Sequence, residues 1–313
     1  MGNEEVLKAL ADVGMPFIIR ESFLGYKYRK KQGQLYDTDQ EIPRKLITMY
    51  YALNPDKQSF DTLKQSFIDH YIKNESDLED IDYSDIHGSI ERAGLGVMYE
   101  YIHSEEIENG GIPPFSFSKI DEIEKQKGRF NIWTLQDLHS KLYSLSPYPE
   151  NAGKFRNDSA YLPGTGTELC GWYDIGDKLW ELSPEVLKLE DHALEIVNIR
   201  EKGLVNEYKE ELFNYIFDVI KLNCQLIKIH PFSDGNGRTI RGFTNKLFED
   251  VGLPPVYIKP NERTEYQVAM NKANNEGDYD SINGFYLYKI CDSIIELDPR
   301  FSLSENKEQK KTI

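Results

Sequence analysis

One short run of the chain gathers most of the side chains that could do chemistry together. Residues 230–241 read His-Pro-Phe-Ser-Asp-Gly-Asn-Gly-Arg-Thr-Ile-Arg. His230 can take up a proton near neutral pH, and Asp234 offers a hard oxygen ligand for a nucleotide-bound Mg²⁺. Arg238 and Arg241, at i and i+3, would share one helix face and could bind phosphate oxygens. These residue types indicate a site for phosphoryl or nucleotidyl transfer.

Two helices are expected to hold this run in place. Residues 208–228 are apolar on nearly all sides, which is typical of the central helix of a domain, and residues 239–248 form a second amphipathic stretch. Gly235 and Gly237, on either side of Asn236, predict a turn that opens this second helix. Its backbone N–H groups would lie at the positive end of the helix dipole, which suits a phosphate chain.

The rest of the chain shows mostly helical spacing, with one exception. Between residues 149 and 180, glycines alternate with aromatic residues, which favours a hairpin or an ordered flap. Residues 74–86 are rich in Asp, Glu and Ser and are expected to form an acidic loop. The sequence therefore predicts an all-α bundle with one β-hairpin. Further helices are expected over residues 41–53, 59–73, 90–108, 118–127, 134–145, 264–275 and 280–296.

Composition narrows the classes of partner and compartment. The 313 residues carry a formal net charge of −16, which argues against nucleic acid and against an anionic membrane surface. No apolar run reaches the roughly 18 residues that a membrane helix needs, and the first residues lack the pattern of a signal peptide. The three cysteines form no CxxC pair, which indicates a reducing compartment. We expect a cytoplasmic protein.

The run at 230–241 resembles the signature loop of the Fic family, His-Pro-Phe-x-[Asp/Glu]-Gly-Asn-Gly-Arg-x-x-Arg, and every fixed position is filled. Residues 152–156 resemble the start of the family's flap, which clamps the nucleotide and aligns the target. Residues 263–266 and 274–278 resemble the helix that lines its adenine pocket. The resemblance covers roughly residues 95–295 and implies a Fic-type helical bundle with a β-hairpin flap, preceded by a mostly helical N-terminal region.

The resemblance implies a protein adenylyltransferase. His230 would be the general base that deprotonates a hydroxyl of a target protein, which then attacks the α-phosphate of ATP. Asp234 would hold Mg²⁺. The family's kinase-like branch has Lys at the position of Gly237, so glycine there favours AMP transfer. The phosphate chain would be bound by Asp234, Gly235, Asn236, Gly237, Arg238 and Arg241.

Contacts with adenine and the flap are implied less directly. The chain has one residue more between Tyr266 and Asn275 than the family spacing, which leaves the register of that helix open. The flap tip differs widely among family members. The residues expected to contribute are Leu162, Pro163, Gly164, Thr165, Tyr266 and Asn275.

A self-inhibitory motif is also expected. Residues 104–109, Ser-Glu-Glu-Ile-Glu-Asn, match the family pattern [Ser/Thr]-x-x-x-Glu-[Gly/Asn]. The resemblance implies that Glu108 forms a salt bridge with Arg241, that Ser104 anchors the inhibitory helix, and that ATP is thereby held out of line for transfer.

The expected organisation has four parts: an N-terminal helical region of unknown role over 1–90, the inhibitory helix over 91–112, the Fic core over 113–298 and a disordered tail over 299–313. Expected partners are ATP, an unidentified target protein and the protein itself as a target; a homodimer is left open. Two alternatives also stay open: removal of AMP from a modified target at the same site, and a nucleotide-binding or interaction module without catalysis.

Overall fold

The computed structural model describes residues 3–31, 40–53, 58–82, 84–147, 149–162 and 165–301. Within these ranges the chain is helical and contains no β-strand. The α-helices are α1 (Asn3–Asp12), α2 (Phe17–Lys31), α3 (Glu41–Leu53), α4 (Gln58–Leu78), α5 (Ile86–Ile102), α6 (Ile120–Gln126), α7 (Thr134–Leu142), α8 (Ile175–Glu201), α9 (Val205–Ile229), α10 (Asn236–Asp250), α11 (Arg263–Asn271) and α12 (Asp280–Leu297). The all-α prediction is confirmed.

Short helical turns complete the described elements. A π-helical turn, η6 (Lys272–Glu276), continues directly from α11. The 3₁₀ turns are η1 (Glu105–Asn109), η2 (Phe117–Lys119), η3 (Pro149–Asn151), η4 (Trp172–Asp174) and η5 (Pro260–Glu262).

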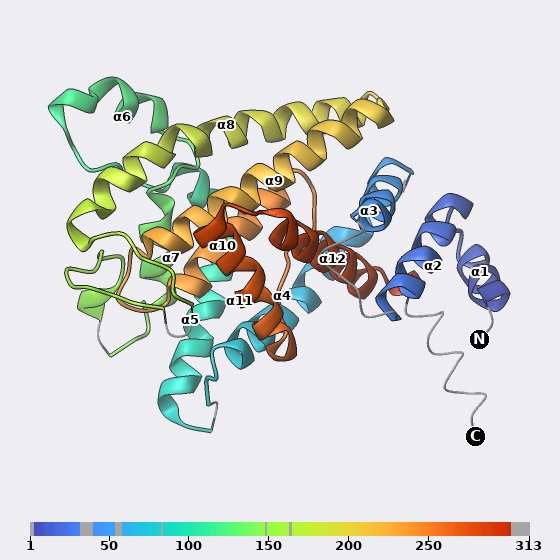
Figure 1. The fold of residues 1–313 in the computed structure, drawn as a ribbon, viewed down its shortest axis with the longest axis horizontal. Coiled ribbons are helices and arrows are strands. Elements are labelled where there is room, and N and C mark those ends of the chain that lie inside the picture. The colour runs from blue at the N-terminus through green and yellow to red at the C-terminus, as the bar shows by residue number, and fades with distance from the viewer. Residues whose placement is uncertain are drawn as a thin grey trace.

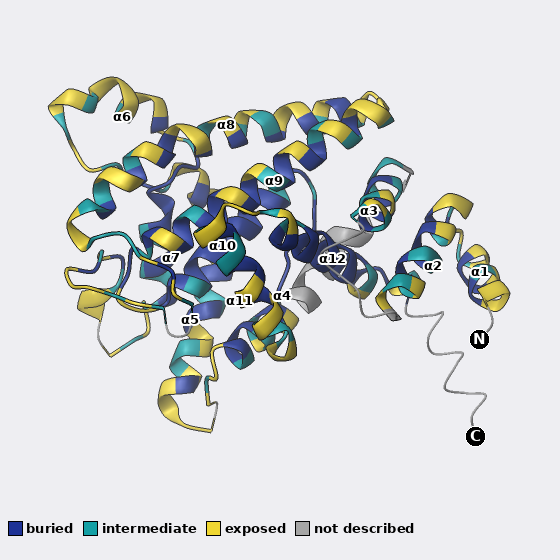
Figure 2. Ribbon diagram, in the orientation of Figure 1, coloured by how far each residue is buried: buried dark blue, intermediate teal, exposed yellow. Residues whose placement is uncertain are grey.

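Helices α9 and α10 form the centre of the bundle (Figure 1). Helix α9 packs against α8 on one side and α10 on another, and α10 also packs against α5, α7 and α8. Nearly every residue of α10 from Asn236 to Phe248 is buried, including its polar and charged side chains. Figure 2 shows exposed residues concentrated on α6, α1 and the outer side of α8. The loop between α9 and α10 therefore lies between two helices of the bundle centre.

The N-terminal helices lie at one end of the molecule and α6 at the other (Figure 1). Helices α2 and α3 pack together, α3 packs against α9 and α12, and α4 packs against α5. The hydroxyl of Tyr26 donates a hydrogen bond to Asp292 on α12 (2.7 Å), and Tyr50 donates one to Asp298 (3.0 Å). These contacts join the N-terminal helices to the rest of the bundle.

Two expected elements differ from the structure. The helix expected over 90–108 ends at Ile102, and Ser104 begins the separate turn η1. The β-hairpin is absent from the described part of the flap, because backbone N–H groups there bind the end of α9 instead of a partner strand. Arg156 N–H donates to the carbonyl of Pro231 (2.9 Å), and Cys170 N–H donates to that of Lys228 (3.1 Å). Residues 163, 164 and 302–313 lie outside the described ranges.

Within the described residues, no helix has both the length and the apolar character that a membrane span needs.

Candidate functional site

The loop between α9 and α10 is shaped by two residues with positive φ. His230 ends α9 with φ +51°, and Gly235 precedes α10 with φ +70°. A residue other than glycine seldom adopts this left-handed backbone conformation unless its surroundings impose it. Such backbone strain is concentrated at functional sites. The side chain of Asn236 closes the loop, because its amide accepts from Phe232 N–H (2.8 Å) and donates to Phe232 C=O (2.6 Å).

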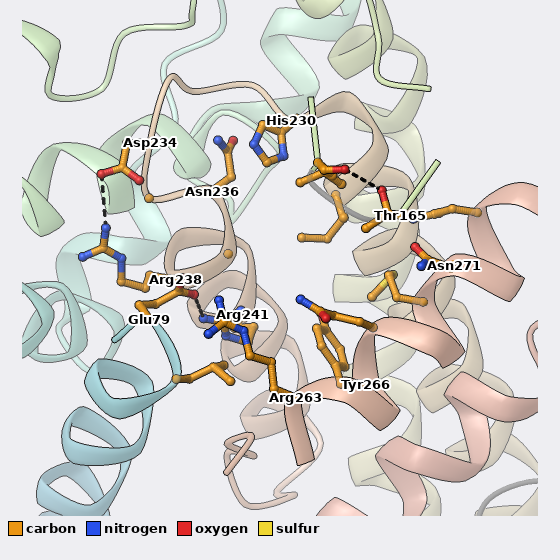
Figure 3. Close-up of a pocket in the computed structure, with 18 of the residues that line it drawn as sticks. Glu79, Thr165, His230, Asp234, Asn236, Arg238, Arg241, Arg263, Tyr266 and Asn271 are labelled. Carbon is orange, nitrogen blue, oxygen red and sulfur yellow. Dashed lines mark hydrogen bonds and ion pairs between the residues drawn. The ribbon is translucent and has the colours of Figure 1, made fainter. Parts of the chain in front are cut away.

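A pocket of about 400 Å³ opens beside this loop, a size that suits a small-molecule ligand. Figure 3 shows His230, Asn236 and Asp234 on the loop, Arg241 and Glu79 below them, and Thr165 on the flap side. The predicted residues that line the pocket are Leu162, Thr165, His230, Asp234, Gly235, Asn236, Gly237, Arg238, Arg241 and Tyr266. The structure therefore brings the predicted loop, flap and α11 residues to one cavity.

The extra residue between Tyr266 and Asn275 is accommodated by the π turn η6, because a π turn takes one more residue than an α turn. Tyr266 and Asn274 then line the pocket. Asn275 does not, but its side-chain amide donates to the backbone carbonyl of Thr165 (3.3 Å). Asn275 thus contacts the flap. Pro163 and Gly164, also expected here, lie outside the described residues.

His230 is held as a neutral imidazole. Burial, and next the Arg156 guanidinium, lower the pKa of His230 to about 4. Its Nδ1 is buried and has no hydrogen-bond partner among the described residues. At neutral pH the ring can therefore accept a proton.

Arg156 connects the flap to the end of α9. Its buried guanidinium donates to the carbonyls of His230 (2.7 Å) and Ile229 (3.4 Å), and on the flap to those of Asp158 (2.6 Å) and Cys170. The prediction that residues 152–156 begin the flap agrees with this placement. Arg156 itself had no predicted role, and only the structure shows that its charge lies near His230.

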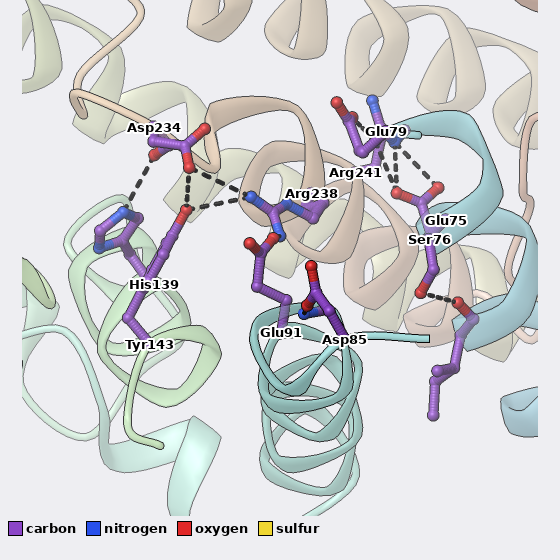
Figure 4. A network of polar contacts seen from close by, with 12 residues as sticks. Glu75, Ser76, Glu79, Asp85, Glu91, His139, Tyr143, Asp234, Arg238 and Arg241 are labelled. Carbon is purple, nitrogen blue, oxygen red and sulfur yellow. Dashed lines mark hydrogen bonds and ion pairs between the residues drawn. The ribbon is translucent and has the colours of Figure 1, made fainter. Parts of the chain in front are cut away.

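Asp234 and Arg238 share a network with α7 (Figure 4). Tyr143, the residue after α7, donates its hydroxyl hydrogen to Asp234 Oδ2 (2.7 Å) and accepts from Arg238 Nη2 (3.0 Å). Arg238 Nη1 also pairs with Glu91 of α5 (2.6 Å). Burial opposes ionisation of Asp234, but the Tyr143 hydroxyl and Arg238 lower its pKa. An ionised carboxylate at the mouth of the pocket fits a Mg²⁺ ion that also keeps water and phosphate ligands.

His139 of α7 is held from both sides. Its Nδ1 accepts from Gly153 N–H (2.8 Å), so Nε2 carries the ring hydrogen and donates to the carbonyl of Asp234 (3.1 Å). The ring stacks on Phe232 with centroids 3.9 Å apart. Burial, which is the main cause, and the Arg238 charge lower the pKa of His139 to about 4. This histidine, which the sequence had not singled out, joins the flap to the loop.

Arg241 is paired with two carboxylates, Glu75 in α4 and Glu79 just after it, and the predicted partner is wrong. Its Nε donates to both carboxylate oxygens of Glu75 (2.9 and 2.8 Å), and its Nη2 reaches Glu75 Oε2 and Glu79 Oε1 (both 2.6 Å). Glu75 is fully buried, whereas the side chain of Glu79 is 33% exposed and lines the pocket. Burial opposes ionisation of Glu79, but Arg241 and then Arg238 lower its pKa.

Glu108 pairs instead with Lys246 Nζ (2.9 Å), and its side chain is 50% exposed. Lys246 lies five residues after Arg241, which on a helix is about 140° around the axis. Because α5 ends at Ile102, the turn η1 delivers Glu108 to that other side of α10. Ser104 donates to the carbonyl of Tyr101 (2.8 Å) and so caps its own helix end.

The acidic residues 74–86 had been expected to form a loop, but α4 continues to Leu78. Tyr71, Glu75 and Leu78 are all buried, and their spacing of i, i+4 and i+7 places them on one helix face. This helical spacing predicts that the helix continues to Leu78, whereas the cluster of acidic residues favours a loop.

The chain is similar to known proteins in sequence. Residues 129–248 match the Fic/DOC family. A protein adenylyltransferase Fic from Drosophila ananassae is 48% identical over 153 residues, covering 49% of this chain and 26% of that protein. A protein adenylyltransferase fic-1 from Caenorhabditis briggsae is 27% identical over 158 residues, covering 50% of this chain and 27% of that protein. This chain thus spans about a quarter of the length of these relatives.

Solved structures share the fold. A Fic domain containing signaling protein from Bacteroides thetaiotaomicron superposes with a TM-score of 0.56 at 14% identity, covering 84% of this chain and 98% of that one. A fragment of Fic-1 from C. elegans superposes with a TM-score of 0.53 at 16% identity, covering 82% and 68%. Glu75 and Glu79 lie outside the segment that matches the family.

We predict that the free energy of unfolding falls as pH drops from about 6.5 to about 4. The pKa of His139 is lowered from 6.5 to about 4 in the folded state, so the unfolded chain binds more protons in this window. His139 alone should contribute a loss of roughly 2 kcal/mol at pH 5. Urea unfolding of the wild type and of His139→Gln at pH 7 and pH 5 measures it. The variant should lose less stability between the two pH values, and an equal loss would contradict the assignment.

Proposed function

We propose that this chain, which carries a domain of the Fic/DOC family, transfers AMP from ATP to a hydroxyl side chain of a protein. The observation that carries the proposal is one pocket lined by a neutral histidine, a carboxylate and two arginines, His230, Asp234, Arg238 and Arg241. The relatives named protein adenylyltransferase support it. A pure binding module would not need a base in the same pocket.

In this reaction His230 is the general base. It takes the proton of the target hydroxyl at a ring nitrogen while the hydroxyl oxygen forms a bond to the α-phosphorus of ATP. The bond from that phosphorus to the bridging oxygen breaks, and pyrophosphate leaves. A hydroxyl is a weak nucleophile, and a positioned base contributes typically about 10²–10⁴-fold to the rate.

The phosphate chain would lie along the start of α10. Gly235, Asn236 and Gly237 line the pocket at the N-terminal end of α10, where the positive end of the helix dipole favours an anion. Mg²⁺, when bound with ATP, would neutralise phosphate charge, and Asp234 is the residue to hold it. Arg238 would support the same phosphates. The adenine ring would lie toward Tyr266 and Met270, which also line the pocket.

The structure supports a restrained resting state, with different residues from those expected. Arg241 already donates to two carboxylates, so it can bind a phosphate only if at least one of them gives way. Removing one partner from a buried ion pair costs roughly 3–5 kcal/mol, which makes spontaneous release rare. We propose that Glu75 is the main inhibitory residue and that Glu79, at the pocket wall, is a second one.

Hydrolysis of an AMP–protein bond is a second candidate function. Glu79 lines the pocket as an ionised carboxylate and could orient a water molecule toward the phosphorus. Incubation of an AMP-modified target with the protein, followed by measurement of free AMP, separates removal from transfer.

We predict that Glu75→Gly raises AMP transfer at least about tenfold, because Arg241 becomes available to phosphate and each 1.4 kcal/mol is a factor of ten. Transfer is measured as label from α-³²P-ATP on the protein itself or in a cell extract. Glu108→Gly is the matched control and should leave the rate near that of the wild type. Glu79→Ala should give a smaller rise, and Glu75→Gly with Glu79→Ala the largest.

Two results would count against this assignment of the brake. One is a strong gain with Glu108→Gly, and the other is no gain with Glu75→Gly although circular dichroism shows that the variant is folded.

We predict that His230→Ala, made in the Glu75→Gly background, lowers transfer by about 10²–10⁴-fold while ATP still binds. Calorimetry measures ATP binding, and the label assay measures transfer. His87→Ala, an exposed histidine outside the pocket, serves as the control and should transfer normally. Full transfer by His230→Ala would remove His230 from the mechanism.

A further inference from the structure

Two polar side chains at the end of α7 point at Asp234: that of His139, in the last turn of the helix, and that of Tyr143, the residue after it. His139 donates to the backbone carbonyl of Asp234 (3.1 Å), and Tyr143 donates to its carboxylate (2.7 Å). Figure 4 shows both side chains reaching the same corner of the loop. The C-terminal end of α7 therefore fixes both the main chain and the side chain of Asp234.

The side chain of Asp234 needs such support because it is 76% exposed. An exposed carboxylate turns freely between rotamers, and ordering it costs conformational entropy. Tyr143 holds Oδ2, and the Tyr143 oxygen is itself fixed by Arg238 Nη2 at 3.0 Å. Arg238 Nη2 also lies 3.5 Å from the same oxygen. Oδ2 is therefore anchored, while the carboxylate as a whole stays exposed to a ligand.

We propose that Tyr143 is the positioning residue that gives Asp234 its affinity for the Mg²⁺ of a Mg²⁺–ATP complex, with His139 as the anchor of the main chain. This inference rests on the proposed function. Groups that orient a metal ligand typically change metal affinity about 10–100-fold when they are removed.

The same helix links this corner to the flap. Gly153 has φ +71°, and a Cβ at this position would lie 2.1 Å from Ser140 Oγ of α7. Its N–H donates to His139 Nδ1 (2.8 Å). The origin of the flap therefore lies directly against α7, so the flap and Asp234 are positioned by a common element.

The test measures ATP binding by calorimetry at a series of Mg²⁺ concentrations, with the full chain and with Tyr143→Phe. The variant removes one hydroxyl and keeps the ring. We expect the Mg²⁺ concentration at half-maximal binding to rise about tenfold, with little change in ATP affinity in EDTA. Tyr101→Phe is the matched control, because Tyr101 also donates to a carboxylate, that of Asp137 (3.4 Å), away from the pocket. It should leave the Mg²⁺ dependence unchanged.

A double-mutant cycle with Asp234→Asn guards against a general loss of structure. If Tyr143 acts through Asp234, Tyr143→Phe should have almost no further effect on Mg²⁺ dependence in the Asp234→Asn background. An equal loss of ATP binding with and without Mg²⁺, or an additive loss in the double variant, would overturn the inference while leaving the proposed function intact. No binding of Mg²⁺–ATP by the wild type or by Glu75→Gly would overturn both.

Discussion

The burial of the Arg241 charge is the constraint on which the rest of the site depends. A guanidinium inside a helical bundle must be neutralised, and here Glu75 of α4 and Glu79, the residue after α4, supply two carboxylates. Only one set of acceptors can occupy its donors at a time. In the proposed function, phosphate and carboxylate compete for the same cation, so the restraint we propose would follow from a stability requirement. The competition also explains why helices outside the segment that matches the family have a role at the pocket.

A second buried arginine, Arg156, lies at the end of α9, where it binds the carbonyls of His230 and Ile229. Arg156 is buried but is held by main-chain carbonyls, among them those of His230 and Cys170, so its charge is not cancelled by a carboxylate among these contacts. That charge lowers the pKa of His230, in addition to the effect of burial. A single side chain thus ties the flap to the loop and keeps the proposed base neutral. Backbone N–H groups of the flap donate to carbonyls at the end of α9. Within the described residues these hydrogen bonds take the place of those to a partner strand.

The sequence predicted the parts of the site that are encoded locally. The loop from His230 to Arg241 carries its turn, its helix start and its charged groups within one run, and the pocket contains them as expected. The partner of Arg241 could not be found in this way, because Glu75 lies 166 residues away and nothing local marks a glutamate as buried. Glu108 fitted a short motif, but a helix that ends a turn and a half early placed it beside Lys246. The extra residue before Asn275 was visible in the sequence, whereas its absorption by a π turn was not.

The central question is which acceptors the Arg241 guanidinium binds when nucleotide is present. A crystal structure of the wild-type protein with Mg²⁺ and ATP measures this most directly. The account requires that Arg241 stays within hydrogen-bond distance of Glu75 in that complex, with the terminal phosphate displaced from it. If Arg241 instead binds the terminal phosphate in the wild type while Glu75 lies without a cationic partner, Glu75 does not restrain the proposed AMP transfer.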